Sequence, residues 1–108
     1  MANNFKLKTK ANIGVTTVGI YTVPAATTST IIGITLANTS GTGINVGIGI
    51  TRVSADNINV LKNVPIPQGS SLEVMQGNKV VLEATDTLTV VSDVTSSLDV
   101  AVSLLEMT

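Results

Sequence analysis

The stretch INVGIGITR, residues 44–52, decides the fold class of this chain. Isoleucine or valine occupies every second position from Ile44 to Ile50, and the positions between them hold asparagine and glycine. Successive side chains of a β-strand point to opposite faces, so this period of two places all the large apolar groups on one face. The stretch therefore predicts a strand with one face in the core and the other face outside it.

Similar segments lie on both sides of this stretch, with turn residues about every 8–12 positions, as in β-sandwiches. The further expected strands cover residues 5–10, 15–23, 30–38, 58–64, 71–75, 79–82, 87–92 and 98–106, with turns at 41–43 and 76–78. Threonine, valine and isoleucine make up 41 of the 108 residues, and β-branched side chains favour strands over helices. We therefore predict an all-β fold, a single antiparallel β-sandwich of about eight strands, for which jelly-roll connectivity is one option.

A length of 108 residues suits one domain, so residues 1–108 are expected to form a single β-sandwich domain. Residues 1–14 are expected to be an extended N-terminal arm or an edge strand. Residues 64–67, VPIP, predict an edge or crossover segment, because proline lacks the N–H that a central strand donates. The side chains expected in the core are Ile32, Ile34, Leu36, Val46, Ile48, Ile50, Leu88, Val90, Val100 and Val102.

Charged residues are scarce and unevenly distributed. They make up only 12% of the chain, about half of the usual share of roughly 25%. Such a surface is either dominated by threonine, serine and asparagine or partly covered by neighbouring subunits. The net charge is +4 over residues 1–62 and −5 over residues 63–108, which is compatible with charge-complementary contacts between copies. The sequence shows no signal-peptide pattern and no apolar run typical of a transmembrane helix, so we expect synthesis in the cytosol.

The residue inventory argues against an enzyme. Histidine and cysteine are absent, which removes the commonest general base and the usual zinc ligands. Asp86, together with Glu83, is either a weak cation ligand or a turn residue whose carboxylate accepts backbone N–H groups, and we favour the turn. Phe5 and Tyr21 are the only aromatic residues, too few for a sugar-binding or base-stacking platform. We expect no catalytic, cofactor-binding or metal-binding residue, and no nucleic-acid, membrane or small-molecule partner.

Two features are candidates for protein contacts. Lys6, Lys8 and Lys10 share one face of an extended segment, which serves either to protect a strand edge or to contact an acidic protein surface. Gly47 and Gly49 leave a bare patch without side chains on the second face of the 44–52 strand. Glycine weakens a strand, so its presence at both positions needs a reason. The bare patch indicates either a strand bent over a curved core or close approach by another backbone, a long side chain or a neighbouring copy.

Four segments of the chain resemble small virion structural proteins of tailed phages, including cyanophages. They are IYTVPA at 20–25, LANTSG at 36–41, VPIPQGSSL at 64–72 and VLEATDTL at 81–88, and the resemblance extends over roughly residues 18–106. These motifs mark turns and strand starts. One departure is Thr85, where such proteins often carry glycine, so a turn that needs a positive φ there forces an uncommon conformation on threonine.

The resemblance implies a non-enzymatic structural protein located in the virion. The leading interpretation is a capsid decoration, or cement, protein that stabilises the shell by protein–protein contacts. One alternative is a neck, tail or fibre component of the virion, and a second is a carbohydrate-binding or adhesin module. The expected partners are other copies of the chain, with a trimer as the expected homo-oligomer, and the major capsid protein or other virion proteins.

Overall fold

The computed structural model describes residues 3–53, 55–74 and 79–108. Strands form 65% of it, and the described residues include no helix, which confirms the all-β prediction. The described part of the chain therefore contains no helix capable of crossing a membrane. The strands are β1 (Asn3–Ile13), β2 (Val18–Thr22), β3 (Thr28–Asn38), β4 (Ile44–Thr51), β5 (Ile58–Ile66), β6 (Ser71–Glu73), β7 (Val80–Leu82), β8 (Thr87–Ser92) and β9 (Leu98–Met107).

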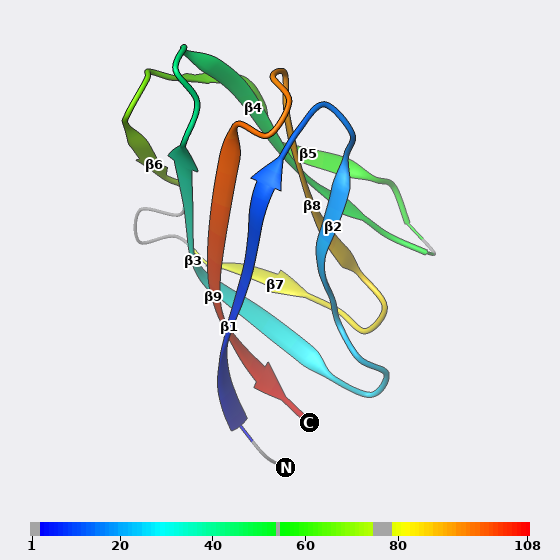
Figure 1. Ribbon diagram of the computed structural model, residues 1–108. Helices are drawn as coiled ribbons and strands as arrows, with labels where there is room; N and C mark the ends of the chain where they lie inside the picture. The colour runs from blue at the N-terminus through cyan, green and yellow to red at the C-terminus, as the bar shows by residue number, and fades with distance from the viewer. Residues whose placement is uncertain (1–2, 54, 75–78) are drawn as a thin grey trace.

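The strands form two antiparallel sheets that pack as a sandwich (Figure 1). One sheet has the order β1-β9-β3-β6, with β7 also paired to β3, and the other has the order β2-β8-β4-β5. Because β6 and β7 both pair with β3, they together occupy one strand position. Apart from β4 and β5, which are consecutive in one sheet, the chain then alternates between the sheets in the order of a jelly roll of eight strand positions. The jelly-roll option raised by the sequence is therefore the topology observed.

The core lies between the sheets and is built from the alternating strands that the sequence predicts. In β4 the buried positions are Ile44, Val46, Ile48 and Ile50, and in β9 they run from Leu98 to Leu104 at every second residue. Nine of the ten expected core residues are buried: Ile34, Leu36, Val46, Ile48, Ile50, Leu88, Val90, Val100 and Val102.

Ile32 is the exception, and the prediction that it is buried was wrong. Its side chain is 36% exposed, whereas Ile31 is buried. The pairing of β3 with β9 matches Ile31 to Leu104 and Gly33 to Ser103, with a register shift between them. Ile32 is therefore the extra residue of a β-bulge, and an inserted residue reverses which positions face the core on either side of it.

The prediction for the proline segment and the two turn predictions have different outcomes. Pro65 lies on β5, which pairs only with β4 and forms an edge, as expected for a proline-containing strand. The sequence predicts a turn at 41–43, and we interpreted it as a hairpin turn between the strands on either side of it. That interpretation was wrong, because β3 and β4 belong to different sheets, so residues 39–43 carry the chain across the sandwich. The turn expected at 76–78 lies outside the described residues.

Candidate functional site

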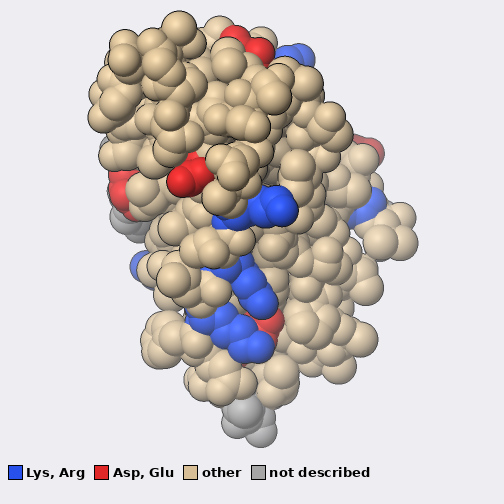
Figure 2. Space-filling model, viewed as in Figure 1, with Lys and Arg blue, Asp and Glu red and all other residues tan. Residues whose placement is uncertain are grey.

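Strand β1, Asn3–Ile13, lies at one edge of the five-stranded sheet. It pairs only with β9. Lys6, Lys8 and Lys10 lie opposite the buried residues Leu104, Val102 and Val100 of β9. Residues directly opposite each other on antiparallel strands point to the same face, so the three lysines point to the inner side of their sheet. Figure 2 shows them as a row of blue basic groups along the course of β1.

Lys6 has a partner inside its own chain. Its ammonium group lies 3.2 Å from Oε1 of Glu106, whose residue is only 5% exposed. The second carboxylate oxygen of Glu106 accepts a 2.5 Å hydrogen bond from the hydroxyl of Tyr21. Because that proton is committed to Glu106, the 2.6 Å contact between Tyr21 and Ser29 has Ser29 as its donor. The network joins β1, β2, β3 and β9, and so ties the two sheets together.

The protonation of this network follows from its hydrogen bonds. The hydrogen bond from Tyr21, assisted by Lys6, lowers the pKa of Glu106 even though burial acts in the opposite direction. Burial, together with the hydrogen bond to Glu106, raises the pKa of Tyr21 to about 12. At neutral pH the site therefore holds an ionised Glu106 carboxylate and a neutral Tyr21 hydroxyl.

The other two lysines of the row differ from Lys6. The ammonium group of Lys8 lies 5.9 Å from the centroid of the Tyr21 ring, at the outer limit of a cation–π contact. Lys10 is exposed and forms no ion pair with any described residue. Two of the three lysines thus lie at the seam between β1 and β2, whereas Lys10 is exposed. Contact of the row with an acidic protein surface remains a prediction.

Gly47 and Gly49 are approached closely by neighbouring strands of the same chain. A Cβ at position 49 would lie 3.1 Å from the carbonyl oxygen of Ile58, and one at position 47 would lie 3.4 Å from that of Leu61. Two register shifts in the β4–β5 pairing accompany this approach. The close approach by another backbone that the sequence indicated is therefore present within the chain, and contact with a neighbouring copy remains a prediction.

A shallow groove of about 310 Å³ crosses the outer face of β4 at these glycines. Its walls come from β5 and β8, and its polar lining includes Asn45, Asn59, Asn63, Thr89 and Asp93. Part of this polarity is already used within the chain, since the carboxylate of Asp93 accepts hydrogen bonds from the backbone and side chain of Asn45.

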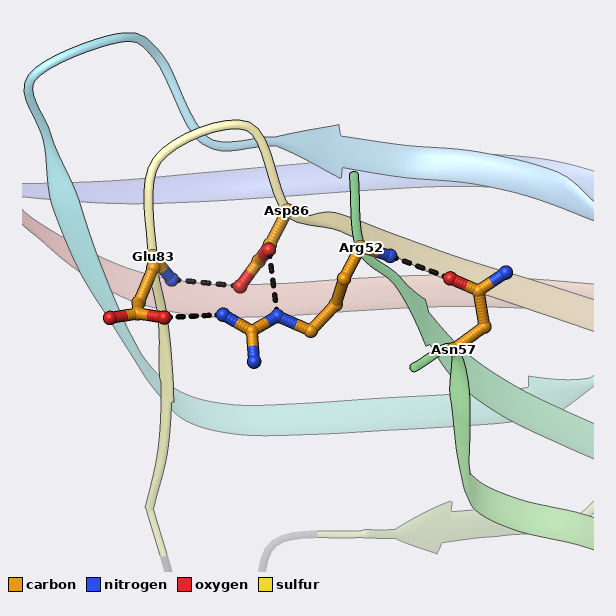
Figure 3. A network of polar contacts seen from close by, with 4 residues as sticks. All are labelled: Arg52, Asn57, Glu83 and Asp86. Atoms are coloured by element: carbon orange, nitrogen blue, oxygen red, sulfur yellow. Dashed lines mark hydrogen bonds and ion pairs between the residues drawn. The ribbon is translucent and has the colours of Figure 1, made fainter. Parts of the chain in front are cut away.

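The second polar cluster of the sandwich is centred on Arg52, which follows β4 (Figure 3). Its Nε donates a 3.0 Å hydrogen bond to Oδ1 of Asp86, and its terminal nitrogen pairs with Glu83. The other carboxylate oxygen of Asp86 accepts the backbone N–H of Glu83 at 2.9 Å. Asp86 is therefore the turn residue that the sequence favoured, and Thr85 beside it has a φ of 72°, the uncommon conformation that the departure from glycine implied.

The contacts of this cluster stabilise the fold by pairing Arg52 with Glu83 and Asp86. The guanidinium group supplies the positive charge that the two carboxylates face, and their hydrogen bonds raise the pKa of Arg52 above its ordinary value. Among the described residues, no group of acidic side chains is arranged to hold a metal ion. Arg52 and Asn57 were not singled out from the sequence. The signal for Asn57 was its place in the β4–β5 turn, where its side chain accepts the backbone N–H of Arg52 at 2.8 Å.

Comparisons with known proteins give a fold and no family. No family model matches the sequence, and no curated protein matches it. One similar solved structure comes from Bacillus endospore appendages, described as a novel family of disulfide-linked pili, with a TM-score of 0.60 and 16% identity over 99% of this chain and 87% of that chain. Another comes from the T13 IBDV viral particle, with a TM-score of 0.60 and 13% identity over 96% of this chain but only 30% of that chain. At these identities the likeness shows a shared all-β fold.

Proposed function

We propose that this protein is a non-enzymatic structural protein of a tailed-phage virion, a capsid decoration protein that stabilises the shell through protein–protein contacts. The observation that carries the proposal is the apolar outer side of edge strand β1. Phe5 is 78% exposed and Leu7 is 64% exposed, on a chain with only 12% charged residues. Burying apolar surface is favourable by about 25 cal/mol per Å². An exposed apolar surface of this kind therefore indicates contact with neighbouring subunits.

The fold and the sequence support this proposal in different ways. The two structural neighbours belong to a pilus and a viral particle, both of which are assemblies of repeated subunits. The sequence segments that resemble phage virion proteins supply the link to a virion. Because the sequence has no cysteine, contacts between copies would form without the disulfide links described for those pili.

In this function the chain acts by binding an assembled form in preference to a dissociated one. A protein that binds only the assembled shell stabilises it by mass action. Its partners are other copies of itself and the major capsid protein, and Lys10 of the lysine row meets an acidic group on one of them. Interactions of this kind are screened by salt, so attachment weakens as ionic strength rises.

Mass spectrometry of purified phage particles, with copy number determined against the major capsid protein, tests the proposal. Hundreds of copies per particle would support a decoration protein, whereas a few to a few dozen copies would instead assign the chain to the neck, tail or fibre. Absence of the chain from particles purified from the phage that encodes it would contradict the virion function.

Carbohydrate binding is a second candidate because of the groove over β4. Asparagine amides and threonine hydroxyls along its walls offer donors and acceptors of the kind that sugars use. No aromatic residue lines this groove, so the affinity would rest on hydrogen bonds alone. Specific binding on a glycan array that is lost in Asn59→Ala would favour this alternative.

A further inference from the structure

The outer face of the five-stranded sheet is uneven from one end to the other. At one end a row of side chains crosses the sheet from strand to strand, each opposite the next in the pairing register: Phe5, Leu105, Thr30 and Val81. Leu7 lies two residues further along β1 on the same face, and bulged Ile32 is also exposed. This end of the face, which we name the large end, is therefore bulky and apolar.

The opposite end of the same face carries small side chains. Two residues further along from Leu7, the row that crosses the sheet is Thr9, Ala101, Thr35 and Glu73. A shallow depression of about 310 Å³ lies here, lined by Thr9, Ala11, Thr35, Ala37, Asp99 and Ala101 among others. We name this the small end. Its depression lies roughly 13 Å along β1 from Phe5, at about 3.3 Å per residue.

The two ends together make the face complementary to itself. A twofold axis that lies in the plane of contact, perpendicular to the strands and near Leu7, places the large end of one copy against the small end of the other. Phe5 of each copy then lies over the depression of its partner. Such an isologous contact closes on itself and leaves neither copy with an uncovered large end.

The charges of the face favour the same orientation. Two acidic side chains lie on this face: Glu73, which accepts hydrogen bonds from Thr35, and Asp99, which lies opposite Ala37. Both belong to the small end. A twofold axis parallel to the strands would bring the two copies of Asp99 together, and like charges in contact are costly. The perpendicular axis instead keeps the carboxylates of the two copies at opposite ends of the contact.

The area of the face is sufficient for a dimer. The sheet is about four strand positions wide at roughly 4.8 Å per strand and about ten residues long at roughly 3.3 Å per residue, which gives roughly 600 Å² per copy. Two copies would bury roughly 1,200 Å², the lower limit of specific interfaces. The expected dimer is therefore specific but of moderate affinity.

We propose that the outer face of this sheet is a twofold interface between two copies of the chain, in which Phe5 of each copy packs into the depression around Ala101 of the other. The proposal deepens the self-association in the proposed function. It differs from the trimer expected from the sequence. Because it concerns the purified chain in solution, it can fail or hold independently of whether the assembly is a virion.

Mass in solution is the first test. Sedimentation equilibrium of the purified chain should give a dimer at tens of micromolar, and Phe5→Ser combined with Leu7→Ser should raise the dissociation constant at least tenfold. Both side chains are exposed, so the variant should fold, which circular dichroism checks. Val15→Ser is the matched control, because Val15 is equally exposed in the loop after β1, and it should leave the mass unchanged. A monomer at high concentration, or an oligomer indifferent to the double substitution, would overturn the proposal.

Cross-linking tests the orientation. The chain has no cysteine, so introduced thiols react alone. Phe5→Cys mixed with Ala101→Cys should form a covalent heterodimer with a short bis-maleimide, whereas Phe5→Cys alone should not cross-link to itself. Efficient cross-linking of the Phe5→Cys variant to itself, with none between positions 5 and 101, would overturn the proposed orientation and with it the interface.

Discussion

The hydroxyl of Tyr21 on β2 donates a 2.5 Å hydrogen bond to the buried carboxylate of Glu106 on β9, and so links the two sheets. A buried carboxylate is costly unless it is paired and hydrogen-bonded. Here one oxygen accepts from Tyr21 and the other pairs with Lys6. The contacts among Lys6, Tyr21 and Glu106 thus cover the side of the sandwich between β1 and β2. Without them, this side of the core would be exposed to water.

Tyr21→Phe is expected to destabilise the protein by about 1.5–3 kcal/mol, the usual contribution of a hydrogen bond to a charged group. The substitution keeps the ring in place but leaves one oxygen of Glu106 without its donor. Urea unfolding followed by circular dichroism measures the change. Thr22→Val is the matched control, because Thr22 lies on the same strand and its hydroxyl has a solvent-exposed hydrogen bond with the neutral hydroxyl of Thr87. This substitution should change the stability by less than about 0.5 kcal/mol. Equal stability of Tyr21→Phe and wild type would show that the bond contributes nothing.

The dependence of stability on pH should have one limb from each member of this pair. The folded-state pKa of Glu106 lies below its ordinary value of 4.5, so its contribution is present above that pH and is lost as pH falls through the folded-state pKa. The pKa of Tyr21 is raised from 10.0 to about 12, so stability is also lost as pH rises across that interval. Unfolding measured across pH should show a flatter acid limb in Glu106→Gln and a flatter alkaline limb in Tyr21→Phe. Limbs unchanged by these substitutions would assign them to other groups.

Ile31 and Ile32 are adjacent and identical in chemistry but differ in burial. Ile31 is in the core, whereas Ile32 is the exposed residue of the bulge. Ile31→Ala should cost about 2–5 kcal/mol because it leaves a cavity. Ile32→Ala should cost well under that, about 0.5 kcal/mol. Thermal unfolding of the two variants side by side gives the comparison, and equal losses would contradict the bulge.

The bulge also shows where sequence reasoning stops. The alternation in β4 and β9 predicted the core correctly because neither strand has an extra residue on its inward face between Ile44 and Ile50 or between Leu98 and Leu104. In β3 the same reasoning was right from Ile34 onward and wrong at Ile32, since a bulge shifts the period by one without changing composition. Likewise, the glycines at 41–43 mark a turn but carry no information on whether the next strand joins the same sheet.

The buried network was in principle visible in the sequence. Continuing the alternation of β9 from Leu104 places Glu106 at the next inward position, where a carboxylate needs a partner. The alternation of the lysines on β1 supplied candidates for it. What could not be read was that β1 pairs with β9 in the register that brings Lys6 to Leu104 and close to Glu106, because pairing between the two ends of a chain leaves no local pattern.

Gly49 is expected to tolerate no side chain without a cost in stability. A Cβ there would lie 3.1 Å from a backbone oxygen of Ile58 and 3.1 Å from Oγ1 of Thr89, closer than ordinary packing allows. Gly49→Ala should therefore destabilise the purified chain by about 1–3 kcal/mol, even though alanine costs a strand less backbone entropy than glycine. Gly41→Ala is the control, because nothing lies within 4 Å of its added Cβ. A stabilised Gly49→Ala variant would show that the strands separate easily, and would leave Gly49 open as a contact for a neighbouring copy.

The lysine row should separate into structural and binding members when each charge is reversed alone. Lys6→Glu places a second carboxylate beside buried Glu106 and should destabilise the fold by about 1–3 kcal/mol, less than the roughly 3–5 kcal/mol of a fully buried pair because Lys6 is half exposed. Lys10→Glu should change the stability by less than about 0.5 kcal/mol, yet weaken attachment to particles and reduce its dependence on salt. Unfolding curves and particle occupancy at two salt concentrations measure both effects. If Lys10→Glu binds particles as wild type does, the whole row protects the edge of β1 and contacts no partner.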